Sequence, residues 1–193
     1  MEARDARALL ERLGEFLDGF EGCFSRRVQR RAASRYVHGL FNDSERKSMQ
    51  AMHGRLSEPS HYQALQHFVT HSPWPDQPLW DRLSDVLPDR GGILAIDDTG
   101  LPKQGRHSVG VKRQYSGTLG KTGNCQVAVT SLLIGPAQVW PLRCELYLPR
   151  DWTEDAARRV EVGVPARVGF REKWRIALAQ IRAARKRGLH VTA

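Results

Sequence analysis

The chain has 193 residues, and its 30 lysines and arginines exceed its 21 acidic residues enough to give a net charge of +9. Hydrophobic residues make up 40% of the chain, which is sufficient for a core, and no apolar run approaches membrane-spanning length. The composition therefore argues against a membrane protein. The positive charge predicts an anionic partner, nucleic acid first, and a generic basic surface is the alternative.

The number and spacing of the cysteines indicate the cellular compartment of the protein. Cys23, Cys125 and Cys144 are odd in number and far apart, without the spacing of metal ligands. Such cysteines are typical of reduced thiols in a cytosolic protein. No charged-then-apolar signal segment opens the chain. We therefore expect a soluble cytoplasmic protein with no membrane partner.

Residues 1 to about 88 have the spacing of amphipathic helices. A helix is expected from Phe24 to Phe41, and its polar face carries arginines without an acidic residue among them. Arg27 and Arg31 on that face are candidates for contacts with a DNA backbone, and a solvated face is the alternative. Ser60 and Gln63 have the spacing of a helix-capping box. We expect residues 1–88 to form a helical, DNA-binding domain.

The period changes from helix to strand between Pro88 and Gly92. The apolar run Ile93–Ile96 leads directly into Asp97 and Asp98 and then a Thr-Gly pair. A short, continuously apolar run predicts a strand that is buried on both faces. Charges do not belong inside such a strand, so we expect both aspartates at or just past its carboxyl end, where catalytic groups collect. The alternative is a turn with two solvated aspartates.

A basic segment follows the two aspartates. No acidic residue occurs from Thr99 to Cys144. This segment supplies four candidates for holding DNA phosphates, although ordinary solvated charges are an equal alternative for each. The four are Lys103, Arg106, Lys112 and Arg113.

Further strands and one helix are expected in the rest of the chain. An irregular β excursion is expected around residues 108–115, with strands at 125–134 and 139–148. Pro141 removes a ladder donor, so the last of these should be an edge strand or bulged. A linker then leads to a helix over residues 170–187, with Trp174 on its apolar face. A strand starting at Leu189 should pair beside the 93–97 strand after a right-handed crossover.

Four ordered motifs carry a resemblance to a known family. They are Ile96-Asp97-Asp98-Thr99-Gly100-Leu101-Pro102-Lys103-Gln104-Gly105, the run from Ser108 to Thr118, Asn124-Cys125-Gln126-Val127, and the run from Glu145 to Trp152. The chain from about Gly39 onward resembles the bacterial insertion-sequence transposases of the DDE superfamily endonuclease family, which have a ribonuclease H-like fold. The resemblance implies an α+β chain: an amino-terminal helical domain, then at 89–193 the first half of a ribonuclease H-like mixed sheet with a crossover helix.

The resemblance also implies a chemistry. Asp97 would be the first of three carboxylates, Asp, Asp and Glu, that hold Mg²⁺ ions for DNA cleavage and strand transfer at transposon ends. Asp98 is expected to have a structural or supporting role. The second Asp and the Glu are not found, so we interpret the chain as an amino-terminal portion, truncated in its fourth strand and inactive in this form.

Two other interpretations remain open. The chain could be a non-catalytic DNA-binding remnant of a transposase, or a decayed reading frame that folds poorly. Salt-dependent binding to double-stranded DNA would separate these two. Because a shortened sheet exposes strand edges, self-association between chains is a further expectation.

Overall fold

The computed structural model describes residues 3–41, 43–45, 47–54, 56 and 62–192. The chain divides into two compact units, Met1–Arg82 and Leu83–Ala193. The capping box expected at Ser60 lies outside the described residues, and the helix that follows it begins at Tyr62.

The first unit is helical. Its core is aromatic: the Phe68 and Trp74 rings are stacked with centroids 5.5 Å apart, and Phe24 lies 5.9 Å from each of them. These contacts bring together segments more than 40 residues apart and so fix how the helices pack. The elements are α1 (Ala3–Asp18), the short 3-10 helix η1 (Glu21–Cys23), α2 (Arg27–Leu40), α3 (Met49–Gly54), α4 (Tyr62–Thr70) and α5 (Gln77–Asp85), whose last residues belong to the second unit.

Helix α2 begins three residues later than the spacing predicts, because Gln29 organises its first turn. The Gln29 side chain accepts a hydrogen bond from the Arg26 backbone N–H at 3.2 Å and donates to the Pro73 carbonyl at 2.9 Å. Gln29 and Ala32 are buried, whereas Val28 is 73% exposed. The opposite side of the helix, with Arg27 and Arg31, therefore faces solvent.

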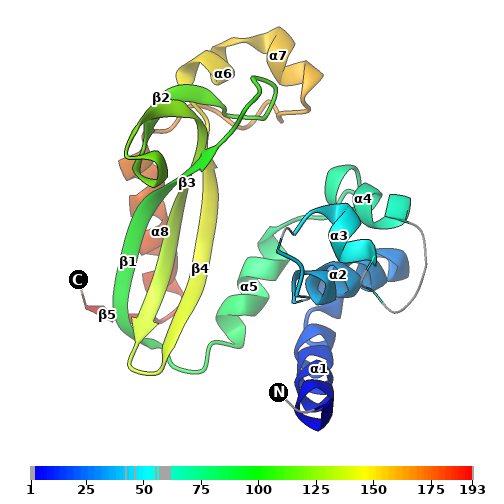
Figure 1. Ribbon diagram of the computed structural model, residues 1–193. Helices are drawn as coiled ribbons and strands as arrows, with labels where there is room; N and C mark the ends of the chain where they lie inside the picture. The colour runs from blue at the N-terminus through cyan, green and yellow to red at the C-terminus, as the bar shows by residue number, and fades with distance from the viewer. Residues whose placement is uncertain (1–2, 42, 46, 55, 57–61, 193) are drawn as a thin grey trace. The chain divides into compact units, whose positions relative to one another are not determined.

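The second unit is built on a mixed sheet of five strands (Figure 1). Strand β3 pairs antiparallel with β1 on one side and with β4 and β2 on the other, and β5 pairs parallel with β1. The helices followed by this sheet confirm the expected α+β class and are compatible with part of a ribonuclease H-like fold. The strands are β1 (Gly91–Pro102), β2 (Lys112–Ser116), β3 (Lys121–Gly135), β4 (Gln138–Tyr147) and β5 (His190–Thr192).

Helix α8 (Lys173–Lys186) covers one face of this sheet (Figure 1). Its buried row is Ile176, Gln180 and Ala184, spaced by one helical turn. The prediction for Trp174 was wrong, since its side chain is 61% exposed. Helical spacing was compatible with burial of either of two faces of this helix. The face that packs on the sheet is the one with the smaller side chains. The core under α8 is formed by Leu87, Leu133, Leu142, Ala184 and Leu189.

Two features of the sheet bear on the sequence predictions. The β3–β4 register shifts between Ser131, which faces Arg143, and Leu132, which faces Pro141. The bulge expected at Pro141 is therefore confirmed, because proline cannot donate to the ladder. The region expected as a linker contains two short helices, α6 (Arg150–Glu154) and α7 (Ala156–Glu161). Trp152 in α6 is buried, and its indole N–H donates to the Val111 carbonyl at 2.8 Å.

Candidate functional site

The two aspartates lie in the middle of β1 and not at its carboxyl end. The ladder with β3 continues past them, with Asp97 opposite Thr130 and Asp98 opposite Val129, as far as Pro102. The expected burial on both faces was wrong, since Ile93 is 56% exposed and residues 97–99 are exposed. Because solvent reaches the strand here, both carboxylates stay hydrated. The two charges therefore do not prevent β1 from continuing to Pro102.

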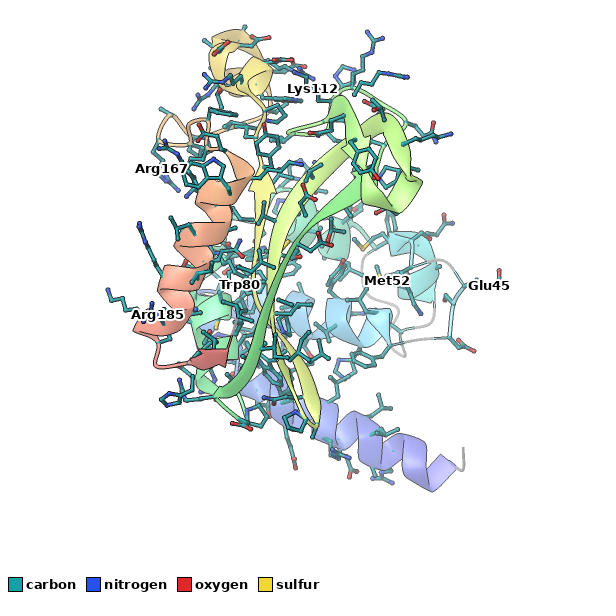
Figure 2. All side chains as sticks on the ribbon, turned by 90° about the vertical axis from the view of Figure 1, so that its left-hand side faces the viewer. Glu45, Met52, Trp80, Lys112, Arg167 and Arg185 are labelled. Atoms are coloured by element: carbon teal, nitrogen blue, oxygen red, sulfur yellow. The ribbon has the colours of Figure 1, made fainter. Side chains whose placement is uncertain are left out.

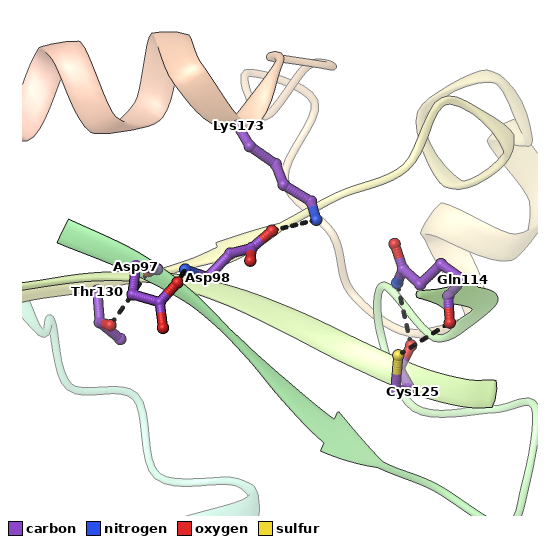
Figure 3. A network of polar contacts seen from close by, with 6 residues as sticks. All are labelled: Asp97, Asp98, Gln114, Cys125, Thr130 and Lys173. Carbon is purple, nitrogen blue, oxygen red and sulfur yellow. Dashed lines mark hydrogen bonds and ion pairs between the residues drawn. The ribbon is translucent and has the colours of Figure 1, made fainter. Parts of the chain in front are cut away.

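Asp97 lies on the face of the sheet away from α8. Side chains alternate along a strand, so the directly paired residues Asp97, Thr130 and Cys144 share one face across β1, β3 and β4. An Asp97 carboxylate oxygen accepts a hydrogen bond from the Asp98 backbone N–H at 2.8 Å. The Thr130 hydroxyl donates to the Asp97 carbonyl at 3.3 Å (Figure 3). We call this side of the sheet, defined by Asp97, Thr130 and Cys144, the open face.

Asp98 points to the other face, toward α8. Its carboxylate forms an ion pair with Lys173, the first residue of the helix (Figure 3). The Lys173 ammonium also lies 5.5 Å from the centre of the Tyr147 ring. Two strands away in the same row, Glu145 forms an ion pair with Arg171. Two carboxylates of the sheet therefore hold two cations at the start of α8.

A buried amide lies about two helical turns beyond Lys173 along α8. The Gln180 side chain donates to the Val129 carbonyl at 3.0 Å, and its own oxygen has no hydrogen-bond partner among the described residues. Sequence reasoning missed this residue, and the available signal was a glutamine inside the apolar row between Ile176 and Ala184.

Gly100 of the aspartate motif has a packing role. A Cβ atom placed there would lie 2.2 Å from the Ser116 hydroxyl oxygen, because the short 3-10 helix η2 (Gly117–Leu119) folds against β1. The Thr118 hydroxyl donates to the Gly100 carbonyl at 2.8 Å. The glycine thus lets the β2–η2 segment close over the end of β1.

The four basic candidates have different surroundings. The Lys112 ammonium lies 2.7 Å from the Asp151 carboxylate, and its hydrogen bond lowers the pKa of that carboxyl. Lys112 therefore already has an anionic partner at the β2 end of the sheet (Figure 2). The Arg106 carbonyl accepts a hydrogen bond from Arg158 at 2.6 Å, which holds its loop. The Lys103 carbonyl accepts one from the Asn124 amide at 2.8 Å.

Arg113 differs from Lys112 in the face it occupies. In the β2–β3 ladder Lys112 is opposite the buried Cys125, whereas Arg113 is opposite Asn124. Asn124 and Thr130 are six residues apart on β3, an even number, so Arg113 shares the open face with Asp97. Of the four basic candidates, Arg113 is thus the one whose strand register places it with Asp97.

The chain was compared with known proteins. The family model described as DDE superfamily endonuclease matches residues 19–193. The chain belongs to the DDE superfamily endonuclease family. It is also 34% identical, over 156 residues, to a protein named as probable transposase for insertion sequence element IS701 from Microchaete diplosiphon. That match covers 78% of this chain and 40% of the relative, so the chain spans less than half of the relative's length. No solved structure matches.

DDE endonucleases are generally dependent on divalent metal ions, which raises the question of the ligands present. Within the described ranges no group of three or more His, Cys, Asp or Glu side chains could hold a metal ion. Asp97 and Asp98 point to opposite faces and cannot bind one ion together. The described residues therefore offer single carboxylate ligands and do not fit a complete metal site.

The remaining candidates lie in the first unit. Arg27 and Arg31 are both exposed on α2, one helical turn apart. They belong to the other compact unit, Met1–Arg82. In the described part of the chain, no helix is long and apolar enough to cross a membrane.

Proposed function

We propose that the chain is the amino-terminal portion of a DDE-type transposase that binds double-stranded DNA at the ends of an insertion sequence. The family match, which spans residues 19–193, carries this proposal. The relative named as a probable transposase supports it. The three free cysteines of the chain agree with a cytoplasmic location.

Asp97 is the residue proposed to supply the first metal-binding carboxylate, and Mg²⁺ is the proposed ion. Its side chain is exposed on the open face, in a strand that is paired on both sides near its start. Mg²⁺ binds through one or two carboxylates and keeps water in its shell, so an exposed aspartate on a rigid strand is a suitable ligand. When bound, the ion would stabilise charge on phosphate oxygens.

By itself this chain is proposed not to cleave DNA. One carboxylate on either face carries too little charge to offset the dehydration of two divalent ions. The chain's own residues hold the Asp97 carboxylate in place on β1 and position basic side chains near it.

Contacts with DNA are assigned to basic side chains. Arg113, Lys103 and Arg106 are proposed to contact phosphates beside the site, and Arg27 and Arg31 to contact the backbone from the first unit. Lys112 has to exchange Asp151 for a phosphate before it contributes. All of these contacts are electrostatic and carry no base specificity.

Asp98 is a second candidate for the metal ligand, for one specific reason. Its carboxylate already binds a cation, the Lys173 ammonium, and a metal ion could replace that ammonium. A second candidate function is a non-catalytic DNA-binding remnant. It is favoured by the lack of a three-carboxylate group among the described residues.

Binding of labelled duplex DNA at increasing salt tests the proposal. If several phosphates are neutralised, the logarithm of affinity should fall linearly with the logarithm of salt, with a slope of roughly −0.9 per contact. A slope near zero would contradict DNA binding by these cations. Binding that is salt-dependent but accompanied by no metal binding at Asp97 or Asp98 would favour the non-catalytic remnant.

A further inference from the structure

An exposed aromatic ring lies on the β2–β3 hairpin. The Tyr115 side chain is 66% exposed on β2, which among the described strands pairs with β3 alone. One edge of β2 is therefore unpaired, and the Tyr115 ring on this strand is mostly in contact with water. Its exposure leaves the ring available to a ligand with a flat apolar surface.

The surroundings of this ring are basic. Arg113 precedes Tyr115 by two residues and therefore lies on the same side of β2. Lys121 at the start of β3 is opposite Ser116 and therefore lies on the other side of the hairpin. The segment from Thr99 to Cys144 has no acidic residue. Asp151, which is outside this segment, is paired with Lys112 on the opposite side of β2. The ring thus shares its side of β2 with the Arg113 cation, in a segment without acidic residues, which favours a polyanion.

The hairpin is held in place by side-chain hydrogen bonds. The Asn124 amide donates to the carbonyls of Lys103 and Gly105, at 2.8 Å each. On the other side of β2, the Gln114 amide donates to the Cys125 carbonyl at 3.1 Å (Figure 3). Arg113 and Tyr115 are therefore presented by an ordered platform, which lowers the entropy lost on binding.

Strand register connects this platform with Asp97. Tyr115 is opposite Thr122, and Asp97 is opposite Thr130, so both pairs use even-numbered residues of β3 on the open face. Eight residues of strand span about 26 Å, at about 3.3 Å per residue. DNA has one base pair per roughly 3.4 Å of axis. If the axis of a bound DNA segment runs along β3, Tyr115 lies about eight base pairs from Asp97.

We propose that Tyr115 stacks on an unpaired base of DNA bound along the open face, while Arg113 contacts the adjacent phosphate. Bases inside a duplex are covered by their neighbours, so an aromatic side chain on a hairpin stacks only on a base that has left its pair. This proposal rests on the proposed function, because it requires DNA on the open face. It adds a preference for DNA with an unpaired base.

Two duplexes of equal length test this proposal, one fully paired and one with a single unpaired nucleotide. The full chain should bind the second duplex more tightly by between about 5-fold and about 150-fold, the range expected for one base on an aromatic ring. Tyr115→Ala should remove that preference, and Tyr115→Trp should keep it. Trp174→Ala, at another exposed ring in the same unit, is the matched control and should change nothing.

The outcomes separate the two proposals. If the chain binds neither duplex, the proposed function fails. If it binds both equally, or if Tyr115→Ala weakens both equally, DNA binding stands and base stacking is overturned. Because Tyr115 is exposed, the variant should unfold at the wild-type temperature. If Tyr115→Ala does not fold, the comparison of Tyr115→Trp with wild type decides: an equal or larger preference supports stacking, and a lost preference overturns it.

Discussion

Asp97 and Asp98 are consecutive in β1, yet their carboxylates lie on opposite faces of the sheet. Asp98 meets Lys173 of α8, whereas Asp97 lies in the row of Thr130 and Cys144. The difference follows from strand alternation, which turns neighbouring side chains to opposite sides. Neighbours in the sequence therefore have separate chemical surroundings, and substitutions can tell their roles apart.

The chain should not nick supercoiled plasmid in Mg²⁺ or Mn²⁺. The reason is that a single carboxylate on each face cannot hold two ions. Agarose gel electrophoresis of the plasmid measures the outcome. Nicking above background that disappears in Asp97→Ala would contradict the proposed inactivity and show that the chain completes a metal site.

Much of the sheet could be predicted from the sequence, because its signals are local. Apolar runs located the strands, and Pro141 indicated the bulge in β4. The parallel pairing of β5 with β1 also agrees with the crossover that the helix between them implies. The position of the aspartates within β1 could not be predicted, since an apolar run does not reveal that no described helix of the second unit covers one face of the sheet.

The partners of charged residues were beyond sequence reasoning for another reason. Lys173 is 75 residues from Asp98, and Lys112 is 39 residues from Asp151. Each pair depends on how α8 or α6 packs on the sheet, and charge patterns constrain that packing weakly. Trp174 shows the same limit, because its helix had two faces of suitable spacing and the buried one contains Gln180.

Arg113→Ala should reduce the salt dependence of DNA binding more than Lys112→Ala does. Arg113 is on the open face, whereas Lys112 has Asp151 as a partner that competes with phosphate. Loss of one contact should flatten the logarithmic slope by roughly 0.9. Fluorescence anisotropy at several salt concentrations measures both variants.

Arg182→Ala and Arg185→Ala, both exposed on α8, are the matched controls for charge (Figure 2 labels Arg185). They should leave the slope nearly unchanged. Arg158 is unsuitable as a control because it bonds the Arg106 carbonyl. Equal effects of Arg113→Ala and the controls would show that DNA does not select the open face.

DNA should protect Cys144 from alkylation. Cys144 is exposed two strands from Asp97, at about 10 Å for a strand spacing of about 4.8 Å. Although the residue is exposed, neighbouring side chains remove part of the water around its sulfur, and this desolvation raises the pKa of the Cys144 thiol. Its reactive thiolate therefore forms at higher pH than in a free cysteine. Labelling should therefore be slow at neutral pH and should speed up as the pH rises above the ordinary thiol range.

Mass spectrometry after iodoacetamide treatment gives the labelling of each cysteine. The buried Cys125 serves as the internal control, because its labelling would report loss of the fold. Burial raises the pKa of the Cys23 thiol too, but Cys23 lies four residues before the proposed DNA contact Arg27 and is therefore not a control. Saturating duplex should slow labelling of Cys144 at least several-fold and leave Cys125 unlabelled. Unaltered labelling of Cys144 in the presence of bound DNA would place the DNA elsewhere on the protein.

The Asp98–Lys173 ion pair should contribute little to stability. The two side chains are 45% and 37% exposed, and such pairs are worth up to about 1 kcal/mol because water screens them. A double-mutant cycle with Asp98→Ala and Lys173→Ala, measured by urea unfolding, gives the coupling free energy. The Glu172–Arg175 pair at the start of the same helix is the control. A coupling above about 2 kcal/mol would mean that the pair is a structural requirement of the fold.

The binding position of a divalent ion tests the proposed function most directly. Paramagnetic Mn²⁺ broadens the amide signals of residues near its site, and it can be titrated into the isotope-labelled chain. Asp97→Asn and Asp98→Asn are matched variants that each remove one charge from β1. We expect weak, localised broadening around Asp97 and Thr130 that is lost in Asp97→Asn and kept in Asp98→Asn. Broadening that survives Asp97→Asn and is lost in Asp98→Asn would contradict Asp97 as the metal ligand and would place the ion on the face of the sheet that α8 covers.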